Sequence, residues 1–172
     1  MTTPLVRIVD DDADARSSSS FFLSMMGLEI KEYESAQRFL DEDDMNRPGC
    51  IILDVRMPDM TGMELQVKLN QKNCRLPIIF LSGHGELDMA VHALKRGASD
   101  FLQKSAKPER LLAAVKKAVT ASMEEFESDS EIETLRKIYD PLTPREKEVA
   151  LGVSKGELNK VIGYNLGISE RS

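Results

Sequence analysis

The chain has 172 residues, of which 41% are hydrophobic and 30% are charged, and its net charge at pH 7 is −6. This composition is typical of a globular protein with one domain of ordinary size and a smaller second part, and the negative charge argues against a surface coated with nucleic acid. No apolar run is long enough to cross a bilayer and the first residues lack a signal-peptide pattern, so we expect a cytoplasmic protein.

Strand-like and helix-like runs alternate through the first two thirds of the chain. Short apolar runs predict strands at residues 5–9, 28–33, 50–55, 77–81 and 100–103. Helical patterns follow them at residues 13–26, after Ser35, after Thr61, at residues 86–96 and from Pro108 onward. Five such pairs in strict alternation predict an α/β fold, in which helices cover both faces of a doubly wound five-stranded parallel sheet.

Local signals mark several helix ends. Ser35 is a typical N-cap residue, and Thr61 with Glu64 has the spacing of a capping box. Gly27 ends the first helix, as glycine often does. The acidic run at residues 41–44 is interpreted as a solvated helix end.

The most informative positions are the residues at the carboxyl ends of the predicted strands. They are Asp10, Asp11 and Asp12 after the first strand, Asp54 on the third, Ser82 on the fourth and Lys104 on the fifth. In a doubly wound sheet these ends lie together at the edge where ligands bind. Clustered carboxylates repel one another, and an all-oxygen site of this kind suits Mg²⁺. We therefore predict a magnesium site at this edge.

Asp54 is the candidate for covalent chemistry in this cluster. A single aspartate after a strand is usually a solvated loop residue, but a carboxylate beside Mg²⁺ can act as a nucleophile and form an acyl phosphate. A transferred phosphoryl group carries spread negative charge, which the Lys104 ammonium and the Ser82 hydroxyl would stabilise. Asp12 has two interpretations, a third acid of the metal site or an acid at the positive end of a helix dipole.

These residues resemble the motifs of a known family. Asp10 with Asp11, Asp54 followed by Met57 and Pro58, Ser82 followed by Gly83, and Lys104 are similar to the receiver domain of two-component response regulators, in particular the FixJ-like branch. The resemblance covers about the first two thirds of the chain. It implies a flavodoxin-like receiver, or phosphoacceptor, domain over residues 1–122.

The resemblance also implies roles for individual residues. Asp54 would accept a phosphoryl group from a sensor histidine kinase, and Asp10, Asp11 and the main-chain carbonyl of Arg56 would hold Mg²⁺ together with Asp54. The residues that bind the phosphoryl group and switch would be Ser82, Lys104 and Phe101. Phosphorylated family members form homodimers through their fourth helix, fifth strand and fifth helix. The protein would assist its own phosphorylation and dephosphorylation, so we do not expect an enzyme.

Residues 123–140 predict an acidic helical linker. Every charged residue between Met123 and Leu135 is acidic, and apolar residues recur at Phe126, Ile132, Leu135 and Ile138. A solvated linker is one interpretation, and an extended helix that pairs with its copy is the other. We favour a long helix, although residues 128–130 interrupt the apolar pattern.

Residues 141–172 begin a second helical unit. Thr143, Pro144 and Glu146 follow the order of an N-cap, a first-turn proline and a capping-box acid. Residues 142–146 resemble the opening of the LuxR-type helix-turn-helix, a DNA-binding domain whose next helix enters the major groove. We expect this chain to stop before that recognition helix. DNA binding would therefore need the full-length C-terminal domain, and no DNA-binding residue is assigned in this chain.

Three functions follow from these patterns. The first is a phosphorylation-switched transcriptional regulator. The second is a receiver protein that signals by dimerisation without DNA binding. The third is an aspartate-nucleophile phosphohydrolase, but such enzymes place a second Asp two residues after the nucleophile, where this chain has Arg56.

Ser105 departs from the family pattern, which has proline directly after the lysine and a cis peptide bond between them. A cis bond before a non-proline residue costs about 2.5–4 kcal/mol, against about 1 kcal/mol or less before proline. We predict a trans bond between Lys104 and Ser105, and slower phosphorylation than in relatives. Ser105→Pro should therefore raise the rate at which a small-molecule phosphodonor modifies the protein, as followed by intact mass. An unchanged rate would contradict this prediction.

Overall fold

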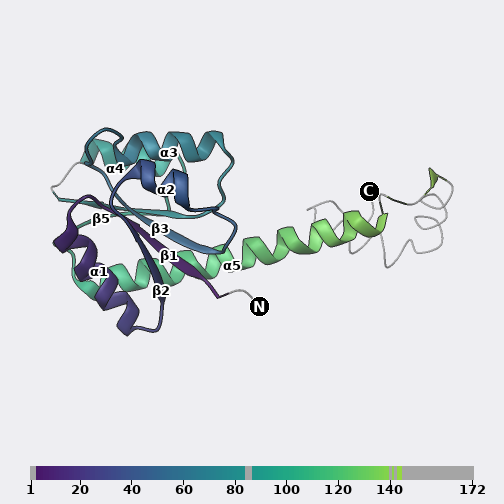
Figure 1. Cartoon of the computed structure of the whole chain (residues 1–172), viewed down its shortest axis with the longest axis horizontal. Helices are drawn as coiled ribbons and strands as arrows, with labels where there is room; N and C mark the ends of the chain where they lie inside the picture. Colours follow the sequence, from purple (N-terminus) through teal and green to yellow (C-terminus); the bar gives the residue numbers. More distant parts are fainter. Residues whose placement is uncertain (1–2, 84–86, 140, 142, 145–172) are drawn as a thin grey trace. The chain divides into compact units, whose positions relative to one another are not determined.

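The computed structural model of the chain describes residues 3–83, 87–139, 141, 143 and 144. Strands and helices alternate in this part of the chain (Figure 1). The strands are β1 (Leu5–Val9), β2 (Glu29–Tyr33), β3 (Gly49–Asp54), β4 (Ile78–Ser82) and β5 (Asp100–Gln103). The helices are α1 (Ala13–Met25), α2 (Ala36–Glu42), α3 (Gly62–Gln71), α4 (Leu87–Lys95) and α5 (Pro108–Tyr139). The predicted α/β alternation is confirmed.

The five strands form one parallel sheet in the order β2-β1-β3-β4-β5. The strand order reverses between β1 and β3, because the chain moves outward to β2 and then returns to the other side of β1. Ligand sites of doubly wound sheets lie at this reversal, outside the carboxyl ends of the strands. Val9 on β1 is aligned with Leu53 on β3, so the residues that follow them, Asp10 and Asp54, are neighbours.

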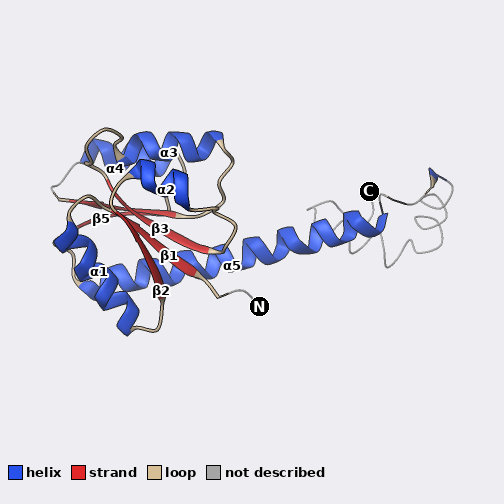
Figure 2. Ribbon diagram, viewed as in Figure 1, coloured by secondary structure: helices blue, strands red, loops and turns tan. Residues whose placement is uncertain are grey.

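Helices cover both faces of the sheet, with α1 and α5 on one face and α2, α3 and α4 on the other (Figure 2). Alternate strand residues such as Val6, Ile8 and Ile52 pack with Leu23 of α1 and Val115 of α5 in one buried cluster. Side chains that alternate in this way along buried strands fix each strand's register, because a shift by one residue would turn them to the other face. This packing holds the strand ends in place.

The predicted caps are present. The Ser35 hydroxyl accepts a hydrogen bond from the backbone N–H of Arg38, 3.1 Å away, at the start of α2. Thr61 and Glu64 form the capping box of α3, in which each side chain accepts a hydrogen bond from the other residue's backbone N–H. These local bonds satisfy donors that a helix N-terminus leaves free.

The last described helix, α5, is continuous from Pro108 to Tyr139. The predicted long helix is confirmed, and residues 128–130 do not interrupt it. The chain divides into two compact units between Met123 and Glu124. The predicted helix-turn-helix lies almost entirely outside the described residues. Among the described helices, none is both long and apolar enough to span a membrane.

An ion pair is buried beneath α2. Arg7 on β1 is completely buried, and its Nε lies 3.1 Å from Oδ2 of Asp43, whose side chain is only 4% exposed. The other guanidinium nitrogens donate to the carbonyls of Leu5 and Arg47, and the Tyr33 hydroxyl donates to Asp43 Oδ2 at 2.6 Å. The interpretation of residues 41–44 as a solvated helix end is therefore wrong for Asp43, because a partner 36 residues away pairs with it.

Asp43→Asn should destabilise the fold strongly. It leaves the buried Arg7 guanidinium without its counter-charge, and breaking a buried pair from one side costs about 3–5 kcal/mol. Urea unfolding at neutral pH measures this cost. Asp44→Asn is the matched control, because Asp44 is exposed. Equal stabilities of the two variants would contradict the role of the ion pair.

The same pair predicts a pH dependence. Burial raises the pKa of Asp43, but hydrogen bonds from Tyr33 and Arg7 outweigh burial and lower the pKa below its ordinary value of 3.8. An acid whose pKa is lowered on folding stabilises the protein fully above its unfolded pKa, and this stabilisation is lost as the pH falls through the folded pKa. The difference in stability between wild type and Asp43→Asn should therefore shrink below about pH 4.

Candidate functional site

The turn after β1 holds Asp10 at the sheet edge. The Asp10 residue is 3% exposed, and its backbone N–H donates to the Tyr33 carbonyl at the end of β2, 3.1 Å away. Its Oδ1 accepts the backbone N–H of Asp12 at 2.9 Å. The Asp12 side chain itself accepts the N–H groups of Asp14 and Ala15 and so caps α1. Asp12 was predicted to be either a third acid of the metal site or an acid at the start of a helix, and the structure supports the second role.

The turn after β3 places Asp54 beside Asp10. Asp54 is 6% exposed and is the last residue of its strand. The chain folds back over it, because the N–H of Gly62 donates to the Val55 carbonyl at 2.9 Å. A Cβ atom on residue 62 would lie 2.1 Å from the Asp54 carbonyl oxygen. Only glycine allows the start of α3 to approach the end of β3 this closely.

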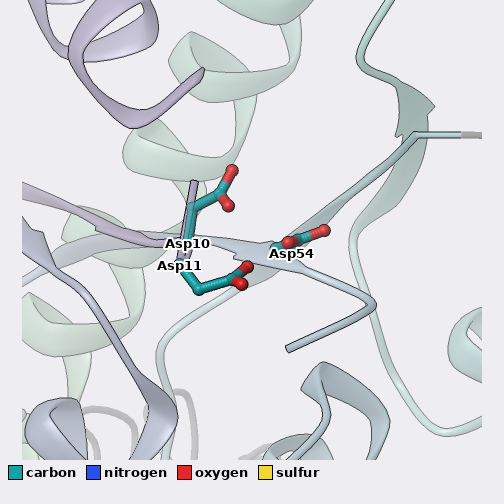
Figure 3. A group of neighbouring side chains, drawn as sticks. All are labelled: Asp10, Asp11 and Asp54. Atoms are coloured by element: carbon teal, nitrogen blue, oxygen red, sulfur yellow. The ribbon is translucent and has the colours of Figure 1, made fainter. Parts of the chain in front are cut away.

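Three carboxyl groups meet at the point where these turns converge (Figure 3). One oxygen each of Asp10, Asp11 and Asp54 can be chosen so that all three lie within 4.8 Å of one another. Asp10 and Asp54 are buried and Asp11 is exposed, so the cluster is open to solvent on one side. Oxygen ligands from a few carboxylates, with room left for water, fit Mg²⁺, which usually keeps several waters when it is bound.

Lys104 brings a positive charge into the cluster. Its Nζ lies 2.9 Å from Asp10 Oδ2 and 3.5 Å from Asp54 Oδ2. Its backbone N–H donates to the Ser82 carbonyl at 2.7 Å, which joins the ends of β4 and β5. Burial lowers the pKa of Lys104, but the two carboxylates outweigh burial and raise it. The described part of the chain contains no cis peptide bond, so the predicted trans bond before Ser105 is confirmed.

Burial and the neighbouring Asp10 carboxylate together raise the pKa of Asp54. Burial raises the pKa of Asp54 well above its usual range, and the charge of Asp10 raises it further. Lys104 and a backbone hydrogen bond from Arg56 act in the opposite direction but do not cancel these effects. The negative charge of the cluster is therefore only partly compensated, and a bound cation would compensate more of it.

The remaining predicted site residues lie on β4, on β5 and after β3. Ser82 is 1% exposed at the end of β4, where it is aligned with Gln103 of β5. Phe101 is partly buried, and its ring centroid lies 5.8 Å from that of Phe80. The Arg56 side chain is exposed two residues after Asp54. The structure thus brings together the acids and Lys104, whereas the roles of Ser82, Phe101 and the Arg56 carbonyl stay predictions.

One contact of Asp10 was not predicted from the sequence. The Arg16 guanidinium donates to the main-chain carbonyl of Asp10 at 2.6 Å and pairs with Glu32 of β2 at 3.3 Å. Arg16 follows the N-cap Asp12 by one helical turn, a spacing that returns its side chain towards the end of β1. That spacing was the available signal, but nothing in the sequence identified Glu32 as the partner.

Two family models match the chain. Residues 6–116 match the response regulator receiver domain, and residues 140–172 match the bacterial regulatory proteins of the luxR family. The second match covers the residues in which the sequence resembles a LuxR-type helix-turn-helix.

Curated relatives and solved structures agree with these matches. The response regulator protein TmoT of Ectopseudomonas mendocina is 40% identical over 96% of this chain and 76% of its own length. The transcriptional regulatory protein FixJ of Azorhizobium caulinodans is 37% identical over 97% of this chain and 79% of its own. The solved structure of the response regulator StyR matches this chain with a TM-score of 0.83 and 34% sequence identity. The match covers 98% of this chain and 85% of the StyR chain. The structure of full-length FixJ from B. japonicum matches with a TM-score of 0.67 and 34% sequence identity. This match covers 99% of this chain and 84% of the FixJ chain.

The raised pKa of Asp54 predicts that Asp54→Asn stabilises the metal-free protein. The folded state holds a proton on Asp54 more tightly than the unfolded chain does, so ionising this carboxyl as the pH rises above 3.8 costs stability. The pKa of Asp54 is raised from 3.8 to about 7. Since a tenfold change in proton affinity is worth about 1.4 kcal/mol, the gain at pH 7.5 should be at most about 4 kcal/mol. It should disappear near pH 4.

Denaturant unfolding without Mg²⁺ at the two pH values measures this gain. The control is Asp59→Asn, because Asp59 is exposed and its φ of 67° is one that asparagine also adopts. A loss of stability in Asp54→Asn at pH 7.5 would show that the carboxyl group is favourable in the metal-free fold.

Proposed function

The chain belongs to the response regulators of two-component systems, with a receiver domain and a LuxR-type DNA-binding domain, and we propose that Asp54 is the residue that is phosphorylated. The phosphoryl donor would be a phosphohistidine of a sensor kinase. The observation that carries this proposal is the convergence of Asp10, Asp11, Asp54 and Lys104 at the strand ends of β1, β3 and β5. The receiver family binds Mg²⁺ at its acidic pocket, and the acids of this cluster fit that ion.

Asp54 supplies the nucleophile in the proposed transfer. One of its carboxylate oxygens attacks the phosphorus, the bond from phosphorus to the histidine nitrogen breaks, and an acyl phosphate forms on Asp54. Mg²⁺, when bound, withdraws charge from the phosphoryl oxygens. The residues proposed to hold it are Asp10, Asp11, Asp54 and the main-chain carbonyl of Arg56. The turn at Gly62 keeps Asp54 at the sheet edge, where a donor can reach it.

Lys104, Ser82 and Phe101 are proposed to respond to the phosphoryl group. The ion pair of Lys104 with Asp54 would be exchanged for one with a phosphoryl oxygen, which carries more negative charge than a carboxylate. The Ser82 hydroxyl, at the end of the neighbouring strand, would donate a hydrogen bond to the same group. Phe101 would then turn inward behind Ser82, so that the change at the site reaches the outer surface of β5.

The proposed output is homodimerisation followed by transcriptional control. The apolar side chains of Leu87, Val91 and Leu94 recur along α4 and are 77%, 43% and 48% exposed. This exposed stripe supports pairing through α4, β5 and α5. The luxR-family match over residues 140–172 supports DNA as the target and argues against the receiver that signals without DNA. We further propose that the protein is a phosphoacceptor and not an enzyme that turns over a separate substrate.

Incubation with a small-molecule phosphodonor and Mg²⁺ tests the assignment. Wild type and the control Asp59→Asn should gain the mass of one phosphoryl group and shift towards a dimer on sizing. Asp54→Asn should show neither change, because its amide is a poor nucleophile. Removal of Mg²⁺ by a chelator should abolish the mass gain. The same mass gain in Asp54→Asn would refute Asp54 as the phosphoacceptor.

A further inference from the structure

Arg16 contacts the proposed metal site through the main chain of Asp10. Its Nη1 lies 2.6 Å from the Asp10 carbonyl oxygen, a short distance for a bond from a charged donor. The Arg16 side chain is only 17% exposed, and its Nε lies 3.3 Å from Oε1 of Glu32 on β2. The guanidinium therefore bridges the turn after β1 and the neighbouring strand.

Asp10 is the most constrained acid of the cluster. Its carboxylate oxygens are both engaged, Oδ1 by the N–H of Asp12 and Oδ2 by the Lys104 ammonium. Its N–H donates to the Tyr33 carbonyl. The sheet pairing of β1 ends at Val9, so the Asp10 carbonyl lies beyond the last aligned pair of strand residues. A buried main-chain carbonyl needs a donor, and Arg16 supplies one.

Residues of the edge strand β2 thus hold both the backbone N–H and the backbone carbonyl of Asp10. The Tyr33 carbonyl accepts the Asp10 N–H directly, and Glu32 holds Arg16, which donates to the Asp10 carbonyl. Ile8 is aligned with Glu32 in the sheet, so these contacts follow from the register of β1 and β2.

The charge of Arg16 by itself would oppose a metal ion. A guanidinium near an Mg²⁺ site repels the ion, but the Glu32 carboxylate compensates that charge. The Arg16–Glu32 pair can therefore fix the geometry of Asp10 while adding little net charge to the site. Electrostatic repulsion and positioning predict opposite effects of removing Arg16, which makes the two roles separable by experiment.

We propose that Arg16 is a positioning residue that sets the Mg²⁺ affinity of the site through the main chain of Asp10, with Glu32 holding Arg16 in place. This inference rests on the proposed function only for the identity of the ion. Outer contacts that orient a metal ligand typically change metal affinity by about 10–100-fold when they are removed.

Calorimetric titration of the full chain with Mg²⁺, without any phosphodonor, tests the proposal. Arg16→Ala should weaken Mg²⁺ binding by about tenfold or more. Arg16→Lys should recover part of the affinity, because an ammonium can reach the Asp10 carbonyl or Glu32 but lacks the fork that reaches both. Arg38→Ala is the matched control, since Arg38 pairs with Glu34 and Glu42 on the exposed surface of α2. It should leave the affinity unchanged.

Unchanged or tighter Mg²⁺ binding in Arg16→Ala would overturn the proposal, and tighter binding would show that repulsion dominates. Thermal unfolding without Mg²⁺ shows whether each variant is folded. If Arg16→Ala does not fold, Arg16→Lys decides, because it keeps the positive charge and removes only the fork that reaches both Asp10 and Glu32. Weaker Mg²⁺ binding in this variant supports positioning, and unchanged binding contradicts it. Wild type that binds Mg²⁺ but is not phosphorylated on Asp54 would refute the proposed function and leave the positioning role standing.

Discussion

Mutual repulsion among three carboxyl groups is the constraint on which the rest of this site depends. Asp10 and Asp11 directly follow β1, and Asp54 ends the adjacent parallel strand β3, so the register of the two strands brings the three acids close together. Lys104 offsets part of the repulsion, and burial increases the remainder. Without a bound cation, the negative charge of the site is therefore not fully compensated. Such a site gains most from ligands that add positive charge and responds to any change in charge at Asp54.

The surrounding structure holds the acids in place against this repulsion. Gly62 lets the start of α3 close over the backbone of Asp54, and Asp12 ties the start of α1 to the turn that carries Asp10. The backbone of Lys104 is bonded to the end of β4. Asp10, Asp54 and Lys104 are thus attached to strand ends by main-chain contacts, which limits how far their side chains can move apart.

The sequence was sufficient for the fold and for the prediction that Asp10, Asp11, Asp54 and Lys104 lie together. Strand and helix periodicity is local, as are the caps at Ser35 and Thr61, and the parallel alternation then brought Asp10, Asp54 and Lys104 to one edge. Contacts between residues distant in the chain were not accessible in this way. Asp43 was assigned to a solvated run because nothing near it reveals Arg7, and Arg16 gave no sign of its pairing with Glu32. Such pairs depend on the register between strands, which periodicity does not specify.

The buried ion pair beneath α2 has a consequence for local unfolding. Among the described strands β2 is an edge strand that pairs with β1 alone, and edge strands are among the first parts of a sheet to open transiently. Tyr33 at its end donates to Asp43, which is paired with Arg7 on β1, so opening of β2 would expose this buried network to solvent. The same strand anchors the backbone of Asp10. The free energy of local opening of β2 therefore sets the fraction of molecules in which the acidic site is assembled, and a contact remote from the chemistry contributes to the population of the binding-competent state.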